Sequence, residues 1–183
     1  AAVLGDPSEV PGRDRLLYFM EKGVVLHQLG DYAASTRMFR QAAEFINRHD
    51  VISASRQTGS LLTSERLVRY RGEYAERLWV HTYLMMNYLL QHRPESALVE
   101  ARLALEVFAE KPDVLDEAHF TRALIAHCFE AAGEINGAYI EYKKLAEGLG
   151  DPAPVADKLV LLGRRLGFRD EVEKFETHLS PRV

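Results

Sequence analysis

The sequence predicts an all-α protein built as a stack of antiparallel helical hairpins, and three observations support this prediction. Leu and Ala together supply 45 of the 183 residues, whereas Gly and Pro supply 19, which favours helices and leaves little turn material for a β-sandwich. Apolar residues recur nearly everywhere at the three- and four-residue spacing of one helix face. The predicted helices are roughly 12 to 18 residues long and are joined by short turns, as in helical hairpins.

The first predicted helix begins near Leu16 and ends at Gly30, where a glycine suits the left-handed position that follows a helix. The second begins at Ala33 and continues past Ile46 as a long helix. Six further helices are predicted over residues 74–90, 94–109, 113–132, 136–149, 155–166 and 170–179.

Small residues recur where two helices of a pair would cross, at Gly23, Ala126 and Ala138. Turn residues follow at Gly30, His92, Gly133 and Gly167, with His92 in the place of a glycine. This pattern is typical of the tetratricopeptide repeat, whose period is about 34 residues. We therefore predict a right-handed stack of about four hairpins, against the alternative of an unrelated helical bundle with accidental glycines.

The turn residues are not evenly spaced, because the chain between Gly30 and His92 is too long for one repeat. We predict an arginine-rich insertion at residues 48–73, with a short helix near residues 63–68. Residues 1–12 are predicted to be a linker or a trimmed end, residues 13–179 a single helical domain, and residues 180–183 a tail.

Composition excludes several classes of protein. The chain carries 23 basic and 27 acidic residues, a net charge of −4, so no bulk attraction to nucleic acid or anionic lipid is expected. The longest apolar stretch, residues 78–90, is interrupted by His81 and Asn87 and is too short to span a bilayer. Cys128 is the only cysteine, which excludes an internal disulfide and a site with several cysteine ligands.

Four segments, at residues 52–56, 70–77, 81–89 and 97–102, resemble an uncharacterised bacterial family of tetratricopeptide-like envelope proteins that are usually made as lipoproteins. The resemblance implies a protein on the periplasmic side of the envelope, held by a lipid on an N-terminal cysteine. This chain does not contain that cysteine, so a membrane contact is expected only through an anchor outside it. The resemblance implies no particular reaction.

A repeat array of this kind normally binds partners along a concave groove lined by the first helix of each pair. The residues predicted to line the groove are aromatic, sulfur-containing or polar: His27, Gln28, Trp79, Thr82, Met86, Phe120, His127, Glu130 and Arg164. Such a mixture suits a peptide or a helix. In the alternative interpretation, Trp79 and Phe120 pack against the insertion or a capping helix.

Arginines are frequent in the insertion and directly after it, and a guanidinium group matches carboxylate or phosphate oxygens in pairs. The residues selected as an anion site or a structural network are Arg71, Glu76, Arg77, His81 and Arg102. The structural interpretation, in which arginines tie the long loop to the helices, is favoured over anion binding.

No pattern in the sequence points to catalysis, a metal or a cofactor. His119 and His127 are eight residues apart on one predicted helix, about 12 Å along its axis, too far to share one ion. A nucleophile elbow of the Gly-x-Ser-x-Gly type is missing, and Cys128 lies in an apolar run typical of a packed, inert thiol.

The function predicted from the sequence is a non-catalytic module of the bacterial cell envelope that binds a protein or peptide partner. Two alternatives remain open. One is an assembly subunit whose groove is filled by its own insertion, and the other is a small-ligand receptor or enzyme with a pocket of Arg, His and Glu around His81.

Overall fold

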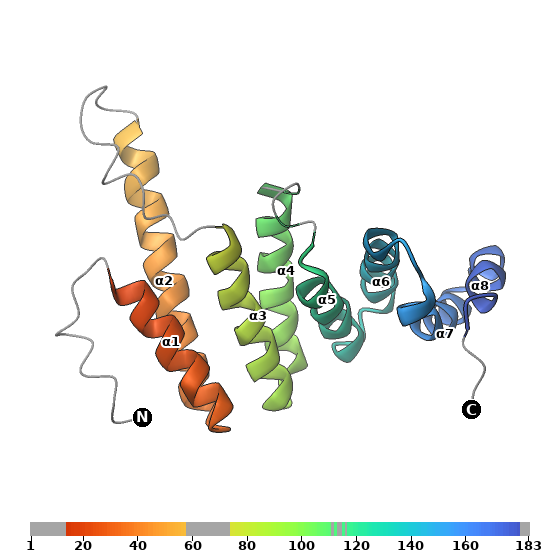
Figure 1. Ribbon diagram of the computed structural model, residues 1–183, viewed down its shortest axis with the longest axis horizontal. Coiled ribbons are helices and arrows are strands. Elements are labelled where there is room, and N and C mark those ends of the chain that lie inside the picture. The colour runs from red at the N-terminus through yellow and green to blue at the C-terminus, as the bar shows by residue number, and fades with distance from the viewer. Residues whose placement is uncertain (1–13, 58–73, 111, 113–114, 116, 180–183) are drawn as a thin grey trace. The chain divides into compact units, whose positions relative to one another are not determined.

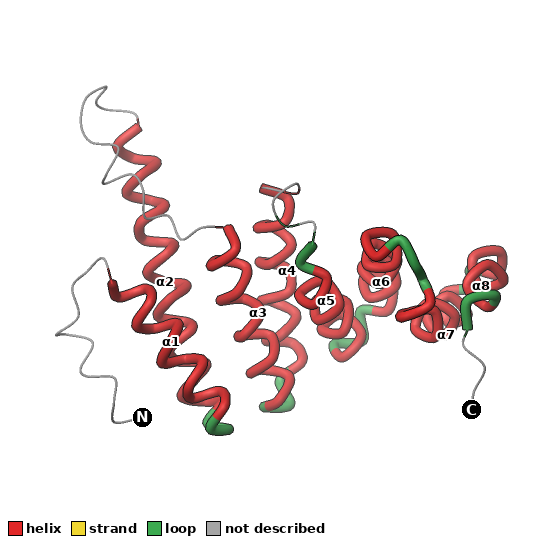
Figure 2. The backbone as a smooth tube through the Cα atoms, in the orientation of Figure 1, coloured by secondary structure: helices red, strands yellow, loops and turns green. Residues whose placement is uncertain are grey.

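The structure of the chain is a computed structural model that describes residues 14–57, 74–110, 112, 115 and 117–179. Every long regular element in these residues is an α-helix (Figures 1 and 2). In chain order they are α1 (Arg15–Gln28), α2 (Tyr32–Gln57), α3 (Tyr74–Leu90), α4 (Pro94–Glu110), α5 (His119–Ala131), α6 (Ile135–Leu149), the short 3-10 helix η4 (Ala153–Val155), α7 (Ala156–Leu166) and α8 (Arg169–Glu176). The predicted all-α class and the long second helix are confirmed.

Several predictions concern residues outside the described part of the chain. These are the linker at residues 1–12, the short helix near residues 63–68, Arg71 and the tail at residues 180–183. They stay predictions, as does the right-handed sense of the whole stack.

The turns that follow α1, α3, α5 and α7 share one geometry. Each contains a residue in the left-handed conformation, with φ of 78° at Gly30, 56° at His92, 79° at Gly133 and 79° at Gly167. The N–H of that residue donates to the carbonyl three residues back, and the next N–H donates to the carbonyl five residues back. This is the Schellman arrangement, which satisfies the last carbonyls of a helix. The predicted turn positions are confirmed, including His92 in the role of glycine.

The chain forms two compact units, Ala1–Arg93 and Pro94–Val183. In the first unit α2 packs against both α1 and α3, and α1 also touches α3. The helices α1 and α2 pack tightly at Gly23, where an added Cβ would come within 2.6 Å of the Phe39 ring. Phe39 is fully buried and stacks on Tyr83 with ring centroids 4.8 Å apart, so its ring has no room to move away.

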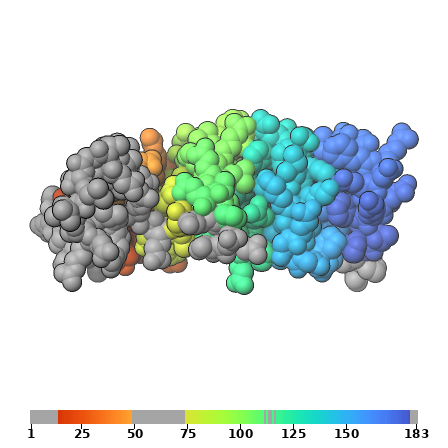
Figure 3. Space-filling model, turned by 90° about the horizontal axis from the view of Figure 1, so that it is seen from above, coloured from red at the N-terminus to blue at the C-terminus, as the bar shows by residue number. Residues whose placement is uncertain are grey.

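In the second unit each helix packs against its neighbour in sequence, and the space-filling view shows α4 to α8 following one another from green to blue (Figure 3). Ala126 and Ala138 are fully buried in the core that α5 and α6 share, as the repeat pattern predicts. Two glycines add close crossings: a Cβ on Gly137 would collide with Phe129, and one on Gly163 would lie 2.8 Å from Val172. Small residues therefore stand at helix crossings in both units.

The main departure from the predicted elements is the start of α5, at His119 rather than near residue 113. The chain before it makes short turn bonds instead of helical ones, from the Leu115 N–H to the Pro112 carbonyl and from the Ala118 N–H to the Leu115 carbonyl. Leu115 is buried, so its apolar side chain packs into the protein at this point. The helix prediction is wrong here because a buried anchor in a turn gives the same local apolar signal as a helix face.

Among the helices that the structure describes, none combines the length and the apolar character needed to cross a membrane.

The crossing at Gly23 yields a stability prediction. Gly23→Ala should lower the free energy of unfolding by about 1–3 kcal/mol, because the new methyl group overpacks against a ring that cannot move. Gly148→Ala is the matched control, since its Cβ would lie 3.5 Å from the nearest atom, in ordinary contact. That control should be neutral or more stable by up to about 1 kcal/mol through helix propensity. Urea unfolding measures both, and an equal effect of the two substitutions would refute the close crossing.

Candidate functional site

Four aromatic side chains from the three described helices of the first unit meet at one surface. We call His27, Tyr32, Trp79 and Tyr83 the aromatic patch. The Tyr83 ring lies at its centre, edge-to-face with Trp79 at 5.6 Å and with His27 at 5.2 Å, and Tyr32 lies 5.5 Å from His27. Trp79 is 49% exposed, so an aromatic ring of a kind that is usually largely buried reaches solvent while it packs against Tyr83.

The spacing of residues on α3 explains why the patch continues along that helix. Trp79, Tyr83, Met86 and Leu90 follow one another at intervals of four, three and four residues, which places them on one side of a helix. None of the four is buried, and Leu90 at the far end is 48% exposed. Their side chains therefore form an apolar stripe along one side of α3 that is partly exposed to solvent.

Thr82, which was predicted to line the groove, behaves differently from this stripe. Its side chain is buried, and its hydroxyl donates a hydrogen bond to the Leu78 carbonyl of its own helix at 2.7 Å. The other predicted member from α3, Met86, is half-buried, and Gln28 of α1 is exposed.

A chain of buried hydrogen bonds lies behind the aromatic patch. Asn87 is fully buried, and its Oδ1 lies 2.7 Å from Nδ1 of His27. Its Nδ2 donates to Oγ of Ser35 at 2.8 Å, and that hydroxyl donates to the Gly23 carbonyl at 2.7 Å. A buried polar chain in which every group has a partner holds its side chains in one arrangement. His27 is thus fixed from within the unit.

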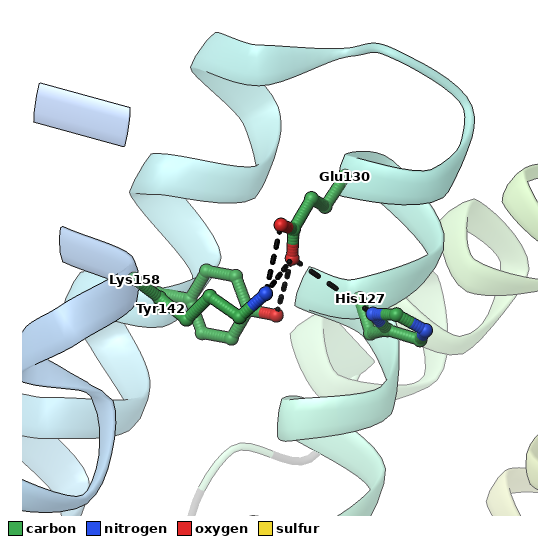
Figure 4. A network of polar contacts seen from close by, with 4 residues as sticks. All are labelled: His127, Glu130, Tyr142 and Lys158. Atoms are coloured by element: carbon green, nitrogen blue, oxygen red, sulfur yellow. Dashed lines mark hydrogen bonds and ion pairs between the residues drawn. The ribbon is translucent and has the colours of Figure 1, made fainter. Parts of the chain in front are cut away.

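The second unit places two of the predicted groove residues in an ionic cluster, shown in Figure 4. Glu130 of α5 accepts hydrogen bonds from the Tyr142 hydroxyl of α6 at 2.9 Å and from Lys158 of α7 at 2.9 Å. His127 lies on the same helix, with Nδ1 3.8 Å from the carboxylate and a side chain that is 53% exposed. One carboxylate therefore links three successive helices.

The electrostatics of this cluster follow from its contacts. Burial alone would raise the pKa of Glu130, but the hydrogen bonds from Lys158 and Tyr142 and the charge of Lys158 outweigh it, so the pKa is lowered. The pKa of Tyr142 is raised, first by burial and then by its hydrogen bond to the Glu130 carboxylate. Both shifts favour an ionised carboxylate that accepts a hydrogen bond from a neutral hydroxyl, which is a structural arrangement.

The same chemistry recurs one helix pair further on. Glu171 of α8 accepts a hydrogen bond from the Tyr139 hydroxyl and lies 3.1 Å from Lys143 Nζ, with both partners on α6. The hydrogen bond from Tyr139, followed by that from Lys143, lowers the pKa of Glu171. In both cases a Tyr–Glu–Lys set links α6 to other helices of the second unit, to α5 and α7 through Glu130 and to α8 through Glu171.

The remaining predicted groove residues are separate features of the second unit. Phe120, on the first turn of α5, is 64% exposed and is the most exposed aromatic side chain among the large apolar residues described. Arg164 forms an exposed ion pair with Glu176 of α8. The groove that would join these residues to Trp79 stays a prediction.

The predicted anion site or arginine network also stays a prediction, because Arg71 lies outside the described residues. Arg77 lies over the Tyr74 ring at 5.8 Å, and Glu76 and His81 are half-buried on the same helix, α3. Arg102, in the second unit, is 58% exposed and pairs with Glu134 at 3.4 Å.

Cys128 does not lie in the environment of a reactive thiol. The Cys128 thiol is buried, and burial raises its pKa to about 12, so it is not a thiolate nucleophile near neutral pH. The prediction of a packed thiol is confirmed. In the part of the chain that the structure describes, no three His, Cys, Asp or Glu side chains come together to hold a metal ion.

Sequence reasoning missed the residues that organise the patch from inside. Asn87 was noticed only as an interruption of an apolar stretch, and Ser35 and Tyr83 were not selected. A polar residue within an apolar helical stretch signals a buried hydrogen-bond partner, but its partners lie 52 and 60 residues away in the sequence.

Comparison with known proteins gives a limited result. The sequence matches no model of a protein family. No curated protein matches it. Among solved structures it is similar to a mutant of the protein MamA, with 15% sequence identity and a TM-score of 0.46 over 90% of this chain and 95% of that chain. A likeness this distant carries no conclusion about what the chain does.

The Glu130 cluster predicts the direction in which the free energy of unfolding changes with pH. Since the folded protein lowers the pKa of Glu130 below its ordinary value of 4.5, the ionised carboxylate stabilises the fold above that pH. This contribution is lost as the pH falls through the lowered pKa. Glu130→Gln should therefore cost about 1 kcal/mol near pH 7, and the difference from the unsubstituted protein should shrink toward pH 3.

Glu134→Gln is the matched control, because its ion pair with Arg102 is exposed on both sides and solvent screens it. It should change the free energy of unfolding little at either pH. Urea unfolding at the two pH values measures both variants. A Glu130→Gln penalty that is the same at pH 3 and pH 7 would contradict the assignment.

Proposed function

We propose that the chain is a non-catalytic binding protein that takes a peptide segment or helix of a partner protein on the aromatic patch and the apolar stripe of α3. The observation that supports this most strongly is Trp79, which is half-exposed although it contacts Tyr83. Tryptophan and tyrosine dominate the energetics of protein interfaces, because they bury a large area at a small cost in side-chain entropy.

The support beneath the patch strengthens the proposal. Tyr83 is held from behind by the fully buried Phe39 ring, and His27 is held by Asn87. A binding surface whose side chains are already fixed loses less entropy when a partner binds. The stripe from Trp79 to Leu90 gives anchor positions along one helix, which suits an extended apolar partner surface.

The finer parts of the proposal come from the sequence. The resemblance to tetratricopeptide-like envelope proteins supports a partner on the periplasmic side of a bacterial envelope. Phe120, which is 64% exposed, and His127 are candidates for a second contact on the other unit. Helical-hairpin arrays are typically binding scaffolds rather than catalysts, which favours this function over an enzyme.

The experiment compares partner capture by the unsubstituted protein, Trp79→Ala and Val25→Ala. Val25 is 40% exposed on α1, and two helix positions from His27 it points to nearly the opposite side. Partners are captured from bacterial envelope extract and identified by mass spectrometry, and the affinity of each is then measured with purified proteins. Trp79→Ala should weaken a true partner about thirtyfold, the loss expected for an interface hot spot.

Val25→Ala should change the affinity by less than about twofold, because isolated exposed apolar residues contribute little. Thermal unfolding serves as the second measurement, and Trp79→Ala should keep a melting temperature close to that of the unsubstituted protein. A partner that binds the Trp79 variant normally would refute the proposal. Collapse of the fold in that variant would show that Trp79 is a core residue.

A further inference from the structure

We infer that the neutral imidazole of His27 carries its proton on Nδ1 and presents an unprotonated Nε2 to solvent, so that the aromatic patch takes a partner group that donates a hydrogen bond. This inference deepens the proposed function and rests on it for the presence of a partner. It follows from the direction of the hydrogen bonds behind the patch.

The direction of these hydrogen bonds is fixed at the inner end of the series, at the carbonyl of Gly23. A carbonyl oxygen only accepts hydrogen bonds, so the bond between Ser35 and Gly23 uses the single hydroxyl proton of Ser35. In its contact with Asn87, the Ser35 oxygen must then be the acceptor. The side chain of Asn87 therefore points its NH2 group at Ser35, at 2.8 Å, and its Oδ1 at His27.

The position of the proton on His27, at the outer end of the hydrogen-bond series, follows from the same rule. Oδ1 of Asn87 only accepts, so the 2.7 Å contact with Nδ1 of His27 requires a proton on Nδ1. In a neutral imidazole one ring nitrogen is a donor and the other an acceptor. Nε2 of His27 is therefore the acceptor, and three buried groups on three helices decide its state.

Nε2 is also accessible. His27 is only half-buried, and its one hydrogen bond in the described part of the chain is made by Nδ1. Among the described residues, no buried side-chain nitrogen or oxygen lacks a partner, so an unpaired Nε2 lies where solvent reaches it. The Tyr32 and Tyr83 rings flank the imidazole, and Trp79 borders Tyr83.

This arrangement selects the chemistry of the partner. The rings provide an apolar surface, and the lone pair of Nε2 is the acceptor placed among them. An apolar or aromatic group that carries a hydroxyl or N–H satisfies both features, as the side chains of tyrosine and tryptophan do. A carboxylate would face the lone pair of the neutral imidazole with its own, and a purely apolar group would bury the acceptor unpaired.

The first test measures the tautomer directly by 15N NMR of the imidazole at about pH 8.5, above the ordinary histidine range. His27 should show a protonated Nδ1 and an unprotonated Nε2. Ser35→Ala removes the acceptor that orients Asn87, and the tautomers should then mix. Thr36→Ala is the matched control, because Thr36 lies next to Ser35 and bonds Tyr32 and Gln91 instead. A proton on Nε2 in the unsubstituted protein would overturn the inference.

The second test asks what the patch accepts, with 4-methylphenol as the probe and 4-methylanisole as its methyl ether without a donor. Shifts of the Trp79 indole and of the His27 Nε2 report binding to the full chain. The phenol should bind about fivefold more tightly than the ether, the ratio expected for one hydrogen bond. Equal affinities, or no saturable shift with the phenol, would overturn the donor selectivity.

His27→Asn completes the experiment, because the asparagine NH2 can still donate to Asn87, while the shorter side chain places no acceptor at the position of Nε2. In this variant the phenol should bind no better than the ether. A preference for the phenol that survives in His27→Asn would place the acceptor elsewhere and overturn the inference. Loss of partner capture in Trp79→Ala is a separate result, so failure of donor selectivity and failure of the binding function are distinguishable.

Discussion

The contact between Gly23 and Phe39 is the constraint on which the first unit depends. Because Gly23 has no side chain, the Phe39 ring lies against α1 and is fully buried there. On its other side the same ring stacks on Tyr83, which borders both Trp79 and His27. The surface that we propose as a binding site is thus the solvent-facing end of a series of packed rings, which begins at the backbone of α1 at Gly23.

The two units hold their helices together with different chemistry. In the first unit a neutral chain through Asn87 and Ser35 lies behind aromatic rings, and it fixes orientation without placing a charge in the core. In the second unit the Glu130 carboxylate joins α5, α6 and α7 through Tyr142 and Lys158 (Figure 4). The neutral hydrogen bonds of the first unit leave the Nε2 acceptor of His27 unpaired at the surface. In the second unit, the Glu130 carboxylate accepts its hydrogen bonds from side chains of the same unit.

The local parts of this fold could be predicted from the sequence, because they depend on neighbouring residues. Gly30 and Gly133 could be recognised as left-handed turn residues, and even His92 took the predicted conformation. The close crossing at Gly23 followed from the repeat, but Gly137 was overlooked beside Ala138. Contacts between distant segments could not be predicted, since no spacing rule connects His27 to a buried amide 60 residues away.

The most direct measurement of the central claim is a double-mutant cycle in unfolding free energy between Gly23→Ala and Phe39→Leu. If the methyl group acts by colliding with the Phe39 ring, Gly23→Ala should cost at least about 1 kcal/mol less in the Phe39→Leu background than in the unsubstituted protein. Costs that simply add would contradict the account, because the two positions would then not share the close contact that positions the aromatic patch.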